Sequence, residues 1–262
     1  MSFSSLLHNI ADAEQGPKTC AVFDFDGTII SGYSATAFLK DQIDRGEISP
    51  ADLVQLTQAA TRFGIGSLGF SALMAVHAQY LAGRSETDYI ANSERLFRRA
   101  IAKLIYPEAR QLIEAHRAAG HSIAIISSAT PYQVLPAAKD LGIEHVYATN
   151  LEVEDGQFTG GVVQPTCFGI GKVHAAERFV AQQGSDLENC FFYSDSIDDI
   201  ELLETAGRPV VLNGSRELKK TAREAGWPMT DFSSRGNATG SQVVRSLAAT
   251  GSLVGSFMMG LP

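Results

Sequence analysis

The sequence predicts an α/β fold: a doubly wound parallel β-sheet with helices on both faces, accompanied by a helical insertion and a β-hairpin. Short apolar runs alternate with helical patterns along most of the chain, and this alternation favours parallel strands joined by crossover helices. One long stretch holds helical patterns and no convincing strand, and an Asp-Gly pair separates two stretches of alternating polarity. A chain of 262 residues can bury a sizeable core domain together with a smaller insertion.

Five apolar runs have the length and composition of buried strands, and four helical patterns accompany them. Each of the four patterns ends in glycine, a common helix stop. The predicted strands are 20–25, 122–127, 145–150, 189–195 and 209–213. The predicted helices are 107–120, 131–142, 171–184 and 198–207.

The helical insertion is predicted for residues 31–105, directly after the first strand. Its helical patterns lie at 49–63, 71–83 and 85–104. The core would then combine residues 1–30 with residues 106–235. Within 149–165, the stretch "VEDGQF" places an Asp-Gly turn between alternating residues, which predicts the hairpin.

The composition excludes some functions. The chain has 29 acidic and 21 basic residues and a formal net charge of −8, which disfavours non-specific nucleic-acid binding. The three cysteines show no metal-binding spacing, so we expect reduced, buried thiols in a cytoplasmic protein. The N-terminal stretch "MSFSSLLHNIADAEQGPK" lacks the cationic start of a secretory signal.

The C-terminal stretch is uncharged from Ser246 to Pro262. Its length is at the lower limit for a membrane-spanning helix, and its Gly and Ser content weakens that interpretation. Residues 236–262 are therefore predicted to form an apolar tail or linker. The tail would either pack as a helix or give the cytoplasmic protein a peripheral contact with the inner membrane.

The stretch "AVFDFDGTII", residues 21–30, points to function. Asp24 and Asp26 stand two positions apart at the end of an apolar strand, so their side chains should leave on the same face. Two close carboxylates in a sheet are costly unless a cation or a shared proton relieves them. The carboxyl end of a parallel strand is, however, where α/β sheets bind ligands, and Gly27 permits close backbone approach. For this pair alone, a solvated Asp-Gly turn is the simpler interpretation.

Similar chemistry ends two other predicted strands. Ser127 and Ser128 close one strand, and both hydroxyls could donate to an anion. Asp195 closes another, with Asp199 shortly beyond it. Lys172 opens a predicted helix, where its ammonium group and the helix dipole both favour negative charge. Each residue alone could be a cap or a surface side chain, but together they would meet at one rim of the sheet.

This combination suits phosphoryl transfer. A phosphoryl group needs its oxygens neutralised, a nucleophile in line, and an acid for the leaving oxygen. A carboxylate can itself be the nucleophile and form an aspartyl-phosphate. Mg²⁺ takes one or two protein carboxylates plus waters and phosphate oxygens, and it would keep two acids ionised beside a phosphate.

These motifs resemble the haloacid dehalogenase (HAD) superfamily, in particular its phosphoserine-phosphatase-like branch, subfamily IB. "DFDGT" matches the DxDxT motif, "AIISS" the apolar strand ending in Ser, "GIGKV" the lysine motif and "YSDSIDD" the acidic motif. The resemblance covers about residues 19–232. It implies a HAD-like Rossmannoid core, a helical C1-type cap formed by residues 31–105, a phosphoric monoester hydrolase activity and Mg²⁺ as cofactor.

The resemblance also implies a role for each acid. Asp24 would attack phosphorus and ligate Mg²⁺. Asp26 would protonate the leaving alcohol and then activate water, and its backbone carbonyl would bind the metal. Asp195 would be the second carboxylate ligand, and Asp199 would hold either the waters of the metal or Lys172.

Hydroxyl and ammonium groups complete the implied site. Ser127 and Lys172 would bind phosphate oxygens, and Thr28 would orient the acid pair. Ser128 is a further substrate-binding candidate. In the insertion, Tyr33 stands where true phosphoserine phosphatases carry a substrate-binding Glu, and Arg62 is the candidate for their cap arginine.

The expected substrate is a small phosphate monoester: phosphoserine, histidinol phosphate or a lysophospholipid. The apolar insertion favours a lipid-like phosphate. The chain is also similar to the N-terminal phosphatase domain of bacterial fusions with a lysophosphatidate acyltransferase, so the tail could associate with a membrane or an acyltransferase domain. Two alternatives stay open: a non-catalytic phosphate-binding or regulatory domain of a lipid acyltransferase system, and phosphotransfer to another acceptor, as in mutases.

Overall fold

The core of the protein is a six-stranded parallel sheet. The computed structural model describes residues 1–47 and 67–233. The strand order is β3-β2-β1-β6-β7-β8, so the chain moves outward in one direction from β1 and in the other from β6. The strands are β1 (Cys20–Phe23), β2 (Ser122–Ile126), β3 (His145–Tyr147), β6 (Cys190–Ser194), β7 (Arg208–Leu212) and β8 (Met229–Thr230). The predicted α/β fold is confirmed, and β1 and β6 form the switch point where such sheets bind ligands.

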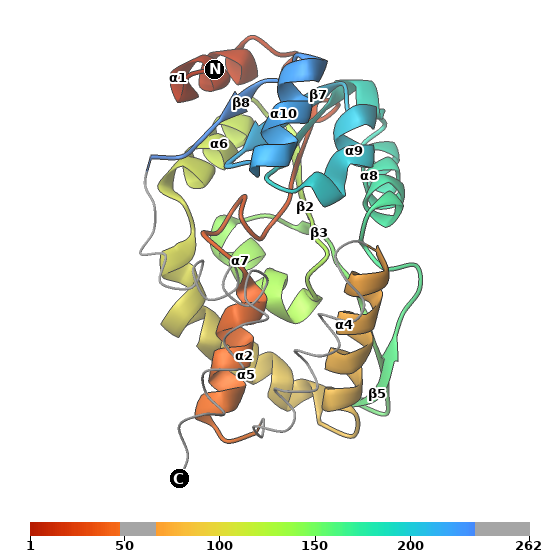
Figure 1. Ribbon diagram of the computed structural model, residues 1–262. Helices are drawn as coiled ribbons and strands as arrows, with labels where there is room; N and C mark the ends of the chain where they lie inside the picture. The colour runs from red at the N-terminus through yellow and green to blue at the C-terminus, as the bar shows by residue number, and fades with distance from the viewer. Residues whose placement is uncertain (48–66, 234–262) are drawn as a thin grey trace.

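Helices cover both faces of this sheet (Figure 1). Alternate strand residues face opposite cores, as the period of a β-strand requires: Phe23 joins one and Val22 the other. The first face carries α1 (Phe3–Ala11), α6 (Pro107–Ala118) and α7 (Pro131–Leu141). The second carries α8 (Ile170–Gln182), α9 (Ile200–Thr205) and α10 (Arg216–Ala225). The sequence analysis did not identify α1, α10 or β8.

The insertion is helical where the structure describes it. It contains α2 (Ser34–Asp44), α4 (Ser67–Leu81) and α5 (Glu86–Leu96), which lie at the opposite end of the molecule from α1 and α10 (Figure 1). The helix predicted at 85–104 is α5 followed by a π-helical turn (Phe97–Ile101) and a 3-10 turn (Ala102–Leu104). The helix predicted at 49–63 lies outside the described residues.

The predicted hairpin is confirmed, and it packs against α4. Strands β4 (Leu151–Glu154) and β5 (Gln157–Val162) pair antiparallel. Asp155 and Gly156 form the turn with positive φ angles of 49° and 74°, as a tight hairpin turn requires. The side-chain amide of Gln79 on α4 donates to the carbonyl of Gly160 at 2.9 Å, so the hairpin and the insertion pack together.

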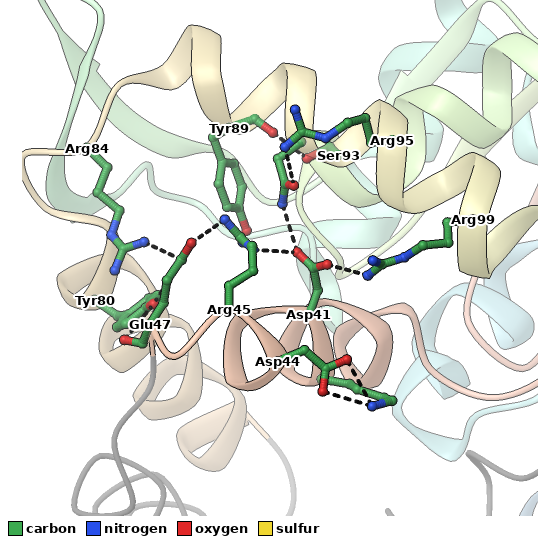
Figure 2. Close-up of polar contacts among 12 residues, drawn as sticks. Asp41, Asp44, Arg45, Glu47, Tyr80, Arg84, Tyr89, Ser93, Arg95 and Arg99 are labelled. Atoms are coloured by element: carbon green, nitrogen blue, oxygen red, sulfur yellow. Dashed lines mark hydrogen bonds and ion pairs between the residues drawn. The ribbon is translucent and has the colours of Figure 1, made fainter.

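A cluster of charged residues joins α2 to α5 (Figure 2). Asp41 on α2 accepts a hydrogen bond from Asn92 of α5 at 3.1 Å, and its carboxylate also pairs with Arg45 and Arg99. Burial raises the pKa of Asp41, but these partners outweigh that effect and hold the pKa below its ordinary value. We call Asp41 and these partners the insertion cluster.

Two other expectations concern cysteines and membranes. Cys20, Cys167 and Cys190 are all buried, free thiols, as predicted. Within 1–47 and 67–233, no helix combines the length and apolarity needed to cross a bilayer. The predicted tail, residues 236–262, lies outside these ranges, and its membrane or acyltransferase contact stays a prediction.

Candidate active site

The site is built where β1, β2 and β6 end. Because these strands are parallel neighbours, their carboxyl ends meet at one edge of the sheet. Asp24 directly follows β1, and its amide still donates to the carbonyl of Tyr193 at 2.9 Å. The strand ends at Phe23, two residues earlier than predicted. The backbone therefore leaves the sheet between Asp24 and Asp26, and their carboxylates have different hydrogen-bond partners; the expectation that they share a face stays a prediction.

Asp24 is paired with a buried lysine. Lys172, in the first turn of α8, places Nζ 2.7 Å from Oδ1 of Asp24 and 2.7 Å from Oδ1 of Asp199. Ser194, the last residue of β6, donates its hydroxyl to Asp199 at 2.6 Å. A Cβ atom on Gly171 would lie 1.9 Å from a backbone oxygen of the preceding loop. Only glycine therefore allows the first turn of α8 to pack this closely against that loop. Asp199 therefore holds Lys172, one of its two predicted roles.

Asp195 lies against the DFDGT turn. A Cβ atom at Gly27 would lie 2.1 Å from Oδ2 of Asp195, and Gly27 has a φ of +80°, so this position requires glycine on two counts. The hydroxyl of Thr28 donates to Oδ1 of Asp195 at 3.4 Å, whereas the prediction assigned it to Asp24 and Asp26. Asn213, which the sequence analysis missed, donates to the carbonyl of Gly27 at 3.0 Å and holds the turn from β7.

Asp26 is held by the insertion. The backbone N–H of Ser34, the first residue of α2, donates to Oδ1 at 2.7 Å, and its hydroxyl donates to Oδ2 at 3.1 Å. The side-chain amide of Gln133 on α7 donates to the same hydroxyl at 3.0 Å. The sequence analysis missed both residues. A signal existed for Gln133, because Thr130 three residues earlier completes a capping box.

The remaining predicted residues are placed as follows. Ser127 follows β2 and is buried, and its hydroxyl accepts from the N–H of Ala129 at 3.1 Å, within its own loop. Ser128 is half-buried beside it. Tyr33 directly precedes α2 and is 50% exposed. Arg62 lies outside the described residues.

The electrostatics show an excess of negative charge. Burial raises the pKa of Asp24 to about 6, although Lys172 opposes this shift. Burial, followed by repulsion from Asp24 and Asp199, raises the pKa of Asp195 well above its usual value. Burial also raises the pKa of Asp26 to about 7, against the hydrogen bond from the Ser34 N–H. Burial opposes the charge of Lys172, but Asp199 and Asp24 outweigh it and raise its pKa.

This excess fits a divalent cation. Among the described residues, Lys172 pairs with Asp24 and Asp199, and Asp26 and Asp195 have no ion pair of their own. Asp24, Asp195 and the carbonyl of Asp26 could hold the metal. In the described part of the chain, no three His, Cys, Asp or Glu side chains form a metal cage by themselves. Mg²⁺ needs no such cage, because it keeps several waters and takes only one or two carboxylates.

Comparisons with known proteins agree with this geometry. A family model described as haloacid dehalogenase-like hydrolase matches residues 21–204. A phosphoserine phosphatase of Mycobacterium tuberculosis is 33% identical over 217 residues, covering 81% of this chain and 70% of that protein. A histidinol-phosphatase of Neisseria meningitidis is 30% identical over 220 residues, covering 82% of this chain and 99% of that protein. A crystal structure of a Bordetella pertussis protein of unknown function superposes with a TM-score of 0.74 at 27% identity, covering 82% of this chain and 99% of that chain.

Proposed function

Because the chain belongs to the haloacid dehalogenase-like hydrolases, which confirms the predicted enzyme class, we propose that it is an Mg²⁺-dependent phosphomonoesterase acting through an aspartyl-phosphate on Asp24. The observation that carries this proposal is the buried bridge from Lys172 to Asp24 and Asp199 at the carboxyl end of β1. The bridge fixes the Asp24 carboxylate at the edge where ligands bind and favours its ionised, nucleophilic form.

Two steps follow from this arrangement. A carboxylate oxygen of Asp24 attacks phosphorus, the bond from phosphorus to the alcohol oxygen breaks, and Asp26 gives the leaving oxygen its proton. Asp26, now ionised, takes a proton from water; the water oxygen attacks phosphorus, and the bond to Asp24 breaks to release phosphate. The raised pKa of Asp26, about 7, supports this double role because it allows both protonation states near neutral pH.

The charges of phosphate and site must be balanced. Bound Mg²⁺ would supply the positive charge that lets Asp24 and Asp195 stay ionised beside a phosphate dianion. Lys172 adds one further positive charge, and Ser127 and Ser128 could donate hydroxyl hydrogen bonds to phosphate oxygens from the end of β2. These roles are proposals that the geometry supports.

The insertion is proposed to act as a cap. It follows β1 in the chain, its first helix contacts Asp26, and closure over the carboxyl edge would exclude bulk water. The named activities of the relatives favour a small phosphate monoester, such as phosphoserine or histidinol phosphate. Tyr33, half-exposed at the start of α2, is the described insertion residue we propose for substrate contact.

The test is phosphate release from phosphoserine, histidinol phosphate and lysophosphatidate, with and without Mg²⁺. We expect Mg²⁺-dependent release from at least one substrate, and we expect Asp24→Asn to lower kcat by at least about 10³-fold. Asp41→Asn is the matched control, because Asp41 is as buried as Asp24 but lies in the insertion cluster. Full activity in Asp24→Asn would refute the nucleophile. Phosphate binding without turnover by the folded wild type would favour the regulatory-domain alternative.

A further inference from the structure

The carboxylate of Asp26 caps the first helix of the insertion. The first N–H groups of a helix have no partner within the helix, and an anion at this end is favoured by the helix dipole. At α2 that anion comes from outside the helix: Oδ1 of Asp26 accepts the N–H of Ser34 at 2.7 Å. The same serine, which is fully buried, also bonds Oδ2 at 3.1 Å. One residue therefore contacts both oxygens of one carboxylate.

The two hydrogen bonds from Ser34 fix the orientation of the Asp26 carboxylate plane, which a single hydrogen bond would leave free to rotate. The terminal torsion of an aspartate is broad, so a single hydrogen bond lets the carboxylate plane rotate. Bonds to both oxygens, from two atoms of Ser34, set the plane. The orientation of an acid–base group matters because misplacing reacting groups by about 1 Å can cost about 100-fold in rate.

The hydrogen bonds that lead from Thr130 through Gln133 and Ser34 to Asp26 have a fixed donor and acceptor order, because some of their groups can only donate. The N–H of Thr130 can only donate, and it donates to Oε1 of Gln133 at 2.8 Å. The other end of the Gln133 amide is then Nε2, which can only donate, and it donates to the hydroxyl of Ser34 at 3.0 Å. The hydroxyl keeps its own proton for Oδ2 of Asp26. Gln133 is 6% exposed, so water does not easily replace it.

We propose that Ser34 and Gln133 are positioning residues that hold the carboxylate of Asp26 for proton transfer. Ser34 acts directly on Asp26, and Gln133 acts through Ser34. This inference rests on the proposed function, in which Asp26 protonates the leaving alcohol. It also links three parts of the molecule to the acid: the insertion through α2, the loop after β2 through Thr130, and α7 through Gln133.

The test varies the leaving group. An alkyl leaving group needs the proton from Asp26, whereas p-nitrophenolate leaves readily without one. Ser34→Ala removes the hydroxyl and keeps the backbone N–H. We expect kcat/KM to fall about 100-fold for the best alkyl phosphate of the panel and less than about 5-fold for p-nitrophenyl phosphate. Ser34→Thr retains a hydroxyl and should stay within about 5-fold of wild type on both substrates.

Two further variants separate positioning from folding. Gln133→Met removes the amide that holds Ser34 and should give the same leaving-group pattern at about 10-fold. Ser93→Ala is the matched control, since Ser93 is a buried insertion serine that donates to the carbonyl of Tyr89 at 2.8 Å and not to an acid. It should leave both substrates nearly unchanged, with a thermal midpoint without metal comparable to that of Ser34→Ala.

The outcomes are distinguishable. Equal losses on both substrates, or no loss, in Ser34→Ala would overturn the positioning role while wild type remains active and Asp24→Asn remains inactive. The same leaving-group pattern in Ser93→Ala would overturn it too, because a general loosening of the insertion would then explain the effect. An inactive wild type, or an active Asp24→Asn, would instead refute the proposed function itself.

Discussion

Asp24 and Asp41 have the same small exposed fraction, 5%, and their pKa values shift in opposite directions. Asp24 follows β1 at the candidate site, and Asp41 lies in the insertion cluster (Figure 2). The difference is in their partners. Asp41 has two arginines and an amide, whereas Asp24 shares one lysine with Asp199.

The surroundings of the partners differ as well. Lys172 is 3% exposed at its side chain, while Arg99 is 65% exposed and Arg45 37% exposed. In the insertion cluster the buried Asp41 is therefore fully neutralised by arginines that reach water, which suits a structural role. The strand-end acids have too few positive partners, an arrangement that costs stability and persists where a cation completes the site.

The largest expected difference follows from removing one cation from each cluster. Lys172→Met leaves buried carboxylates unpaired and should lower the free energy of unfolding by about 3–5 kcal/mol. Arg99→Met removes a mostly exposed partner and should cost less than about 1 kcal/mol. Urea unfolding of both variants without metal would measure this. Similar losses in the two variants would contradict the contrast between the clusters.

An intermediate effect is expected from pH. Burial raises the pKa of Asp24 to about 6 and raises that of Asp195 well above its usual value, so their favourable contribution is present below about pH 4 and is lost as pH rises through the folded-state pKa values. Asp195→Asn should therefore stabilise the metal-free protein at pH 8 and change its stability little at pH 4.

Asp41 is expected to change the stability with pH in the opposite direction. Its pKa is lowered, so its contribution is present above about pH 4 and is lost as pH falls through the folded-state value. Asp41→Asn should lower stability at pH 8 and have less effect near pH 3. Urea unfolding of both variants, at pH 8 and at pH 3 to 4 and with a chelator present, would measure these changes. Destabilisation by Asp195→Asn at pH 8 would show that its charge is already compensated.

The smallest effect is expected for an exposed ion pair elsewhere on α2. Lys40 and Asp44 form an i, i+4 pair at 3.0 Å, with side chains 74% and 51% exposed. Lys40→Met should change the free energy of unfolding by less than about 0.5 kcal/mol, because exposed helical pairs contribute little. Urea unfolding of this variant and of wild type would measure the difference. A loss above 1 kcal/mol would mean that this exposed pair is coupled to the insertion cluster.

Local sequence determined the alternation of strands and helices, the hairpin and the identity of the strand-end residues. Hydrophobic period and turn chemistry act within a few residues, so "VEDGQF" predicts a turn without knowledge of the rest. The rule that parallel strands end at one edge then predicts that Asp24, Ser127 and Asp195 lie at the same edge of the sheet. The position of Lys172 at the start of a predicted helix indicated the same rim, and it lies in the first turn of α8.

Tertiary structure alone decided which groups touch. Asp24 and Asp26 took different hydrogen-bond partners, Lys172 and Ser34, which the strand period could not predict because β1 ends before either acid. Ser34, which binds Asp26, and Gln133, which binds Ser34, lie on two different helices and are 99 residues apart in sequence. A buried hydrogen bond depends on positions to within a fraction of an ångström, and those positions are set by packing of the whole core rather than by any local pattern.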